Sequence, residues 1–267
     1  MQNIDPFLLL EPLLFIAVGV IPVVYWRLKK RFAGVVLLLS LIAYAGAIAA
    51  KEVIQYYTVN SVIADFGSVS WQTGIYFGLQ TSFLEVGLAY VVAVYAVRRK
   101  LVSAMDAESY GVSLGFWENA IVLGALILLN LASTYVLIAE NLLPQSVYQT
   151  LLASEPSVFY PPQQLAVPIA LGTLERFSSF LDHLAWGYLC VMSVCYKRPS
   201  YLVVALPMGL LDALVPFAPT VPAWEFELLI FALSLGFVAV ARVVTRGDRL
   251  SPVPAPREVP LTATPDA

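Results

Sequence analysis

Long apolar runs recur along the chain, and each is apolar on both faces over about 20 residues or more. They lie at 6–26, 32–56, 73–97, 112–139, 165–196, 199–218 and 223–243. A helix of ~20 residues crosses the ~30 Å of hydrocarbon in a bilayer, whereas the strands of a membrane barrel alternate apolar and polar residues. The pattern therefore predicts an all-α fold, a polytopic transmembrane helix bundle of about seven spans.

The composition agrees with a multi-pass membrane protein. Of the 267 residues, 60% are hydrophobic and 12% are charged, and the mean hydropathy is +0.80. Roughly a quarter of an average soluble chain is charged. We therefore expect the cell (cytoplasmic) membrane as the location and the lipid bilayer as a partner. A net charge of −3 without a basic patch excludes a nucleic-acid-binding protein.

Positive charges gather in alternate connections between the predicted spans. Lysine and arginine follow the first, third, fifth and seventh spans, at 27–31, 98–100, 197–198 and 242–249. The connections 57–72, 140–164 and 219–222 hold neither residue. Because positive loops stay in the cytoplasm, this alternation predicts an N-terminus outside and a C-terminus in the cytoplasm.

Two regions of different composition divide the chain. Residues 1–246 hold all the predicted spans and form the transmembrane helical bundle. Residues 247–267 end in SPVPAPREVPLTATPDA, which is rich in proline and small residues and poor in large apolar ones. Such a segment cannot bury enough apolar surface to fold, so we expect a disordered, proline-rich cytoplasmic tail.

The fifth predicted span carries ionisable groups at membrane depth. Its segment LERFSSFLDHLAWGYL (174–189) contains Glu175, Arg176, Asp182 and His183, the last being the only histidine of the chain. On a helix, residues 175, 179, 182 and 183 share one side. Because each such group costs at least a few kcal/mol in hydrocarbon, we expect this polar stripe to face the bundle interior.

Other acidic residues are expected at a similar depth. At ~1.5 Å per residue, Glu85, His183 and Asp212 each lie about 20 Å from the cytoplasmic end of their span. Glu118 is expected about 10 Å from that end, and Lys51 is expected near the outer end of the second span. The third, fifth and sixth predicted spans therefore bring a carboxylate or histidine to the same depth in the membrane.

This pattern leaves several interpretations open. The charges are compatible with ion pairs that hold a bundle together, with a proton path or ion site, and with catalysis. One histidine among scattered carboxylates is not a zinc signature, and the chain has no HExxH motif. We therefore expect no metal and no other cofactor.

Four segments resemble those of a known family. They are TSFLEVGLAY (81–90), GVSLGFWENAIVLG (111–124), ALGTLERFSSFLDHLAWGYL (170–189) and LVVALPMGLLDALVPF (202–217). In order and spacing they resemble the YhfC-type membrane peptidases, which belong with the PrsW and CAAX-protease/bacteriocin-processing intramembrane proteases. The resemblance spans roughly residues 10–217.

The resemblance and the polar stripe together point to seven site residues. The implied catalytic groups are Glu118, His183 and Glu85. The implied supporting groups are Glu175, Arg176, Asp182 and Asp212. By this resemblance a buried glutamate, Glu118 or Glu85, activates water, and His183 assists by orienting it or by donating to the oxyanion.

The chain departs from the family pattern at several positions. The family has two adjacent glutamates, but here Leu84 precedes Glu85, and the next arginine is Arg98. A late family histidine aligns with Met208, and no histidine precedes Glu118. The site therefore has fewer groups than the family pattern.

The resemblance implies a glutamate-dependent intramembrane endopeptidase, a hydrolase whose partner is a transmembrane or membrane-associated peptide. Two alternatives remain open at this point. One is a non-proteolytic membrane scaffold or binding protein on the same fold. The other is an enzyme acting on an isoprenoid or carotenoid lipid, in which a buried acid protonates a double bond.

Overall fold

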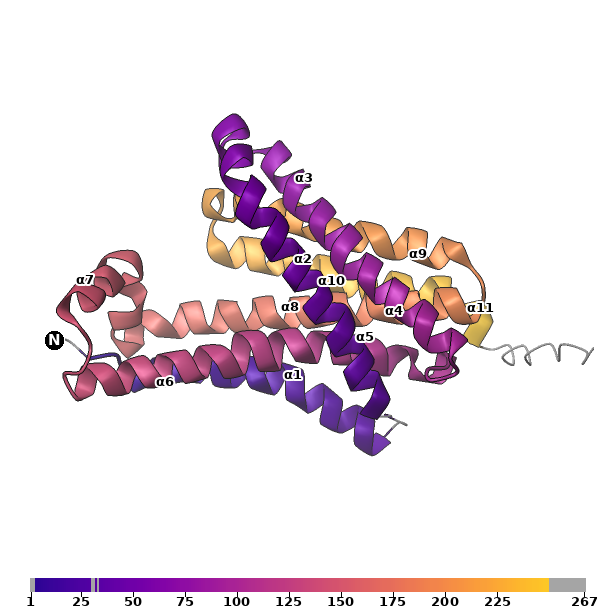
Figure 1. The fold of residues 1–267 in the computed structure, drawn as a ribbon, viewed down its shortest axis with the longest axis horizontal. Helices are drawn as coiled ribbons and strands as arrows, with labels where there is room; N and C mark the ends of the chain where they lie inside the picture. Colours follow the sequence, from indigo (N-terminus) through magenta and orange to yellow (C-terminus); the bar gives the residue numbers. More distant parts are fainter. Residues whose placement is uncertain (1–2, 30–31, 33, 250–267) are drawn as a thin grey trace, which may run out of the picture.

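The computed structural model describes residues 3–29, 32 and 34–249, and every regular element in these ranges is a helix (Figure 1). The α-helices are α1 (Leu10–Lys29), α2 (Gly34–Phe66), α3 (Trp71–Gln80), α4 (Gly87–Arg98), α5 (Ala107–Phe116), α6 (Leu126–Ala139), α7 (Gln145–Ser154), α8 (Pro162–Cys195), α9 (Pro199–Ala205), α10 (Ala223–Val244) and α11 (Arg246–Arg249). The other helical segments are η1 (Pro6–Leu9), η2 (Thr81–Val86), η3 (Ala104–Asp106), η4 (Trp117–Ala125), η5 (Pro156–Phe159) and η6 (Leu206–Thr220).

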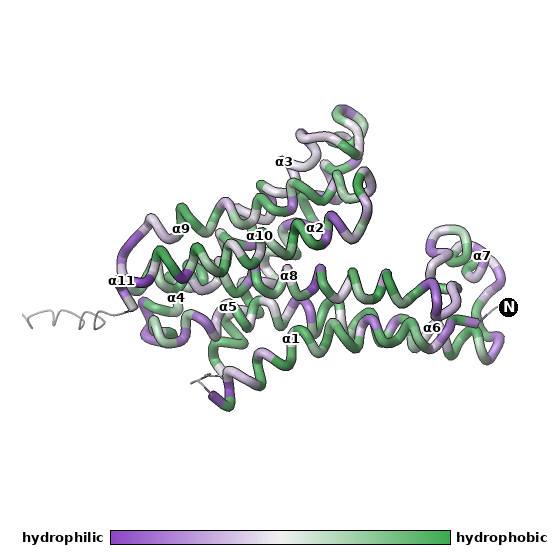
Figure 2. Tube along the Cα trace, turned by 180° about the vertical axis from the view of Figure 1, so that it is seen from behind, coloured by the Kyte–Doolittle hydropathy of each residue, from purple (hydrophilic) through white to green (hydrophobic). Residues whose placement is uncertain are grey.

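Consecutive elements join into helices long and apolar enough to cross a membrane. Among the described residues there are six by length and composition: Pro6–Lys29, Gly34–Phe66, Trp71–Arg98, Ala104–Ala139, Pro199–Thr220 and Ala223–Val244. The long helix α8 is not among them, because it carries the polar stripe. Figure 2 shows hydrophobic residues along most of the helices and hydrophilic segments at their connections. The predicted class, an all-α polytopic membrane bundle, is confirmed.

Two predicted span boundaries are wrong, and each error put a site residue at the wrong predicted depth. Helix α2 continues to Phe66 rather than ending at 56, so Lys51 lies about 22 Å from its end. The fourth span begins at Ala104 rather than 112, so Glu118 lies about 20 Å into it. Both extensions, YTVNSVIADF and AMDAESYG, contain many polar and small residues, so the hydropathy pattern did not predict that they are helical.

Helix α8 lies at the centre of the bundle and packs against α1, α4, α5, α9 and α10. Glycine permits its closest crossing, with α5. A Cβ atom built on Gly111 would lie 2.6 Å from the carbonyl oxygen of Leu184, and one built on Gly187 would lie 2.6 Å from Cα of Gly111. Real Cβ contacts are not that short, so the two backbones approach as closely as they do because both side chains are absent.

Among the helical segments that depart from α geometry, η2, η4 and η6 each have a role at the site described below. Segments η2 and η4 are π-helical, and η6 is a 3₁₀ helix of 15 residues. Proline near the start of η6, together with Pro216 and Pro219 inside it, removes backbone donors that a regular α-helix needs. Such irregular backbone is tolerated at membrane depth where other protein segments cover it, as α3 and η2 cover η6.

The helix ends divide between the two ends of the molecule. The C-terminal ends of α1, α4, α8 and α10 all point toward the end that holds α11, and α7 lies at the opposite end (Figure 1). Basic residues occupy the last turns of α1, α4 and α10. This arrangement is compatible with the predicted orientation, which stays a prediction. Residues 250–267 of the expected disordered tail lie outside the described residues.

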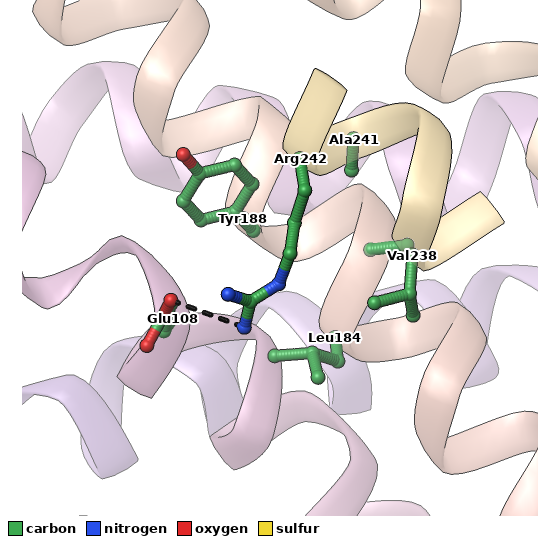
Figure 3. A pocket seen from close by; sticks show the side chains of 7 residues that line it. Glu108, Leu184, Tyr188, Val238, Ala241 and Arg242 are labelled. Atoms are coloured by element: carbon green, nitrogen blue, oxygen red, sulfur yellow. Dashed lines mark hydrogen bonds and ion pairs between the residues drawn. The ribbon is translucent and has the colours of Figure 1, made fainter. Parts of the chain in front are cut away.

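Near the α11 end, α10 is joined to α5 by an ion pair. A guanidinium nitrogen of Arg242 lies 3.4 Å from Oε1 of Glu108. The arginine side chain passes Tyr188 and Leu184 of α8 on its way (Figure 3). The hollow beside this pair has a volume of only about 10 Å³, roughly the space of one water. It is therefore a packing feature of the bundle and too small for a ligand.

Candidate active site

His183 lies between two glutamates at the centre of the bundle, and its side chain is 4% exposed. Its Nδ1 lies 3.2 Å from Oε2 of Glu118 and 2.9 Å from the backbone oxygen of Ser179. Its Nε2 lies 3.5 Å from Oε2 of Glu85. Because both neighbours of Nδ1 are acceptors, we infer that Nδ1 carries a proton. Nε2 makes no regular hydrogen bond within the described part of the chain.

Both glutamates that flank His183 lie on π-helical segments. Glu85 is in η2 and Glu118 is in η4. A π turn inserts an extra residue into an α-helix and redirects the side chains around it, and such turns are frequent at functional sites. Gly115, one turn before Glu118, assists the approach to α8, since a Cβ there would lie 2.8 Å from Cδ2 of Phe180. Local backbone geometry thus delivers both carboxylates to one imidazole.

A lysine supplies the positive charge on the Glu85 side of the site. Nζ of Lys51 lies 2.6 Å from Oε1 of Glu85 and donates a hydrogen bond to Oγ1 of Thr81 over 2.9 Å. It also lies 3.7 Å from Oδ2 of Asp212, to which the Thr81 hydroxyl donates a hydrogen bond. The Lys51 side chain is 16% exposed and that of Glu85 10%. Segments α2, η2 and η6 are therefore tied together by one ammonium group.

An arginine supplies the positive charge on the Glu118 side. One guanidinium nitrogen of Arg176 lies 3.0 Å from Oε1 of Glu118, and another pairs with Glu175. The Ser179 hydroxyl donates to Oε2 of Glu118 over 2.7 Å. The Glu118 carboxylate thus has both oxygens held, one by a cation and one by a hydroxyl and an imidazole. Its orientation relative to His183 is fixed from two sides.

A cavity opens beside this cluster, between α8, η6 and α10. Its volume is about 280 Å³, and its wall includes Arg176, Ser179, Asp182 and Asp212. Two of these, Arg176 and Ser179, also contact Glu118. The cavity is therefore adjacent to the buried centre and large enough for several water molecules, each of which occupies ~30 Å³.

The structure brings the three expected catalytic residues together. Glu85, Glu118 and His183 are in mutual contact through the imidazole, so Glu118 is at the same depth as the other two and not nearer the cytoplasm as expected. The supporting residues divide into three places. Arg176 bridges Glu118 and Glu175, Asp212 faces Thr81 and Lys51, and Asp182 faces the cavity.

Sequence reasoning missed three residues that contact the site carboxylates. They are Lys51, Thr81 and Ser179. A signal existed for Lys51, because it is a lysine inside an apolar helix that requires an anionic partner. Ser179 was on the predicted polar stripe but had no assigned role. Thr81 carried no distinguishing signal.

The fold and the site define a multi-pass membrane protein with a buried acid–histidine centre. Residues 14–222 match the family described as YhfC intramembrane metalloprotease, and the chain belongs to that family. No curated protein and no solved structure matches the chain. The family match covers every residue of the site, from Lys51 to Asp212.

The description of the family names a metal, but the donors of this chain do not fit one. The described residues contain no group of three or more His, Cys, Asp or Glu side chains placed to hold a metal ion. Lys51 engages Oε1 of Glu85, and Arg176 engages Oε1 of Glu118. Nε2 of His183 and Oε2 of Glu85 remain, whereas a catalytic zinc takes three protein ligands.

Proposed function

We propose that this protein is a glutamate-dependent intramembrane endopeptidase with His183 at the centre of its site. The single observation that carries the proposal is the imidazole between two carboxylates, with Nδ1 3.2 Å from Glu118 and Nε2 3.5 Å from Glu85. The family description as an intramembrane protease supports the same reaction class. The substrate class is a transmembrane or membrane-associated peptide, and the location is the cell (cytoplasmic) membrane.

The two glutamates have different surroundings and therefore different proposed roles. Both oxygens of Glu118 are engaged by Arg176, Ser179 and His183. Glu118 is therefore a positioning residue, which holds the proton on Nδ1 and fixes the ring. Glu85 has one oxygen held by Lys51 and directs the other toward Nε2. The general base of the proposal is Glu85.

The reaction follows from these roles. A water that donates to Oε2 of Glu85, beside Nε2 of His183, gives a proton to Glu85 as its oxygen attacks the peptide carbonyl carbon. The oxyanion that develops is stabilised by the Lys51 ammonium group and by His183, whose Nε2 donates when both ring nitrogens carry a proton. Glu85 then returns the proton to the leaving amine. The C–N bond breaks and a carboxylic acid and an amine result.

Water reaches the buried centre in this proposal through the neighbouring cavity. The cavity is lined by charged and hydroxyl groups of α8 and η6, including Ser179 and Asp212. A polar cavity with several partners retains water, whereas an apolar one stays dry. This supports hydrolysis over a reaction that must exclude water. The alternative enzyme acting on an isoprenoid or carotenoid lipid gains no comparable support.

The test is cleavage of a single-pass membrane peptide by the purified protein in liposomes, followed by mass spectrometry. His183→Ala removes the imidazole from the site, and we expect a fall in rate of about 10²–10⁴-fold in a protein that remains folded. Glu140→Gln, at an exposed position, is the matched control and leaves the rate unchanged. Equal rates for the wild type and His183→Ala would instead favour the non-proteolytic scaffold or binding protein.

A further inference from the structure

A second cavity lies between the last turns of α4 and α8, at the end of the molecule that holds α11 (Figure 1). Its wall is formed by residues between Tyr90 and Arg98 on one side and between Ser193 and Pro199 on the other. Its volume is about 470 Å³, within the range of pockets that hold small ligands. It shares no residue with the acid–histidine centre or with the cavity beside that centre.

The wall of this second cavity combines two kinds of surface. Arg98 and Lys197 are exposed where α4 and α8 end, and no acidic side chain of the described residues lines the wall. At ~1.5 Å per residue, Tyr90 lies about 12 Å along α4 from Arg98, so the cavity extends from the helix ends toward the bilayer core. Between these two levels the wall is apolar, with Val94, Val97 and Val194.

The two cations of the wall have no anionic partner in the described part of the chain, because the acids at this end are engaged elsewhere. The engaged groups are Glu108 with Arg242, Asp248 with Arg198, and Asp106 with the backbone N–H and hydroxyl of Ser103. Neither Arg98 nor Lys197 has an ion pair with any described residue. Asp106 also acts electrostatically on Cys195 of the wall, but one acid beside the cavity offsets at most one of its two cations.

We propose that this cavity binds an anionic phospholipid of the surrounding bilayer, with the phosphate at the rim that carries Arg98 and Lys197. A phosphate accepts hydrogen bonds from a guanidinium fork and from an ammonium group. Both basic side chains are long and exposed, so they are free to turn toward a head group. Basic pockets between membrane helices bind lipid head groups in this way.

The apolar part of the wall favours a lipid over a free anion. An acyl chain that continues inward from the phosphate contacts the valines of α4 and α8, Val94, Val97 and Val194. Free phosphate has no group that fills this part of the cavity. The inference goes beyond the proposed peptidase, since lipid binding at this place does not require cleavage of a peptide.

Such a lipid would join two helices that deliver the acid–histidine centre. Helix α4 follows directly on η2, which carries Glu85, and α8 carries His183. A ligand that binds only the folded state stabilises it by mass action. We therefore expect the bound lipid to raise the thermal midpoint of the protein as well as to show selective binding.

Binding is measured by native mass spectrometry of the full-length protein in detergent. The protein is titrated with dioleoylphosphatidylglycerol, which is anionic, or with dioleoylphosphatidylcholine, which has the same chains and no net charge. We expect phosphatidylglycerol to bind at one site about tenfold tighter than phosphatidylcholine, since each basic residue contributes about fivefold. Phosphatidylglycerol alone should raise the thermal midpoint.

Variants of the two basic residues, with matched controls, assign that preference to the cavity. Lys197→Gln and Arg98→Gln each reduce the preference about fivefold. Lys100→Gln and Arg99→Gln remove the same charges at exposed positions outside the wall and leave it intact. Lys100 matches Lys197 closely, because both have a left-handed backbone, with φ of 57° and 56°. Any conformational strain of the substitution is therefore the same in both.

Three results would overturn the inference. The first is equal binding of phosphatidylglycerol and phosphatidylcholine. The second is a loss of preference in Lys100→Gln as large as in Lys197→Gln, which would show attraction to a diffuse basic surface. The third is displacement of phosphatidylglycerol by inorganic phosphate at the same concentration, which would show a site for the free anion. Loss of the preference in Lys197→Gln and Arg98→Gln alone supports the lipid site, whether or not the protein cleaves peptides.

Discussion

Nζ of Lys51 lies 2.6 Å from Oε1 of Glu85 in the interior of the bundle. The ammonium group also contacts Thr81 and approaches Asp212. A site that its family description associates with a metal thus contains a cation from its own chain. In low dielectric such a pair is strongly coupled, and loss of one partner leaves the other charge uncompensated.

We therefore expect Lys51→Met to destabilise the protein. The substitution keeps the length of the side chain but leaves Glu85 without its cation, so the free energy of unfolding falls by about 3 kcal/mol. Lys51→Arg retains the charge, so its free energy of unfolding falls by less. Thermal unfolding in detergent measures both, with Lys29→Met at the exposed end of α1 as the control. Wild-type stability in Lys51→Met would show that the pair contributes nothing.

The crossing of α5 and α8 is expected to be intolerant of a single methyl group. Gly111→Ala places a Cβ 2.6 Å from the carbonyl oxygen of Leu184. We expect it to lower the free energy of unfolding by about 3 kcal/mol, because both backbones must separate. Gly236→Ala in α10 meets nothing within 4 Å and should stabilise by about 0.5–1 kcal/mol. Denaturant titration of the two variants checks the contrast, and equal effects would contradict the packing described.

Metal chelators are expected to leave the protein unaffected. The remaining donors, Nε2 of His183 and Oε2 of Glu85, are too few for a catalytic zinc. We predict that EDTA and 1,10-phenanthroline change neither the thermal midpoint nor the cleavage rate, and that the purified protein holds metal only substoichiometrically. Activity lost on chelation and restored by Zn²⁺ would show that the site rearranges to bind a metal.

The orientation in the membrane is open to a direct labelling test. Arg99→Cys and Glu155→Cys place single exposed thiols in connections of opposite predicted side. If the N-terminus is outside, a membrane-impermeant maleimide labels Glu155→Cys in intact cells and Arg99→Cys only after permeabilisation. The opposite labelling pattern would show that the N-terminus is in the cytoplasm.

The sequence predicted the class, and it singled out residues that the structure brings together, because both rest on strong signals. Runs of apolar residues longer than a bilayer leave few alternatives to membrane helices. Charges inside such runs are costly, so Glu85, Glu118 and His183 stood out individually. Counting residues along each span put Glu85 and His183 at one depth, but it put Glu118 nearer the cytoplasm than it lies.

The remaining features depended on geometry that local pattern does not encode. The π turns that aim Glu85 and Glu118 have no marker in their residues. Lys51 was placed near an outer helix end because polar residues after position 56 hid the rest of α2. The division of the acids into a buried acid–histidine centre and a cavity depends on which helices pack on α8. Asp182 lines a cavity bordered by α10, although the next residue in the sequence, His183, lies in the buried centre.

The central claim is that Glu85 removes a proton from water at Nε2 of His183. The most direct test is the rate of peptide cleavage by wild type and Glu85→Gln in the same liposomes, with thermal midpoints measured alongside. The account predicts that Glu85→Gln folds, retains peptide binding and cleaves about 10²–10⁴-fold more slowly. Cleavage by Glu85→Gln at the wild-type rate would contradict the assignment of the base and the mechanism built on it.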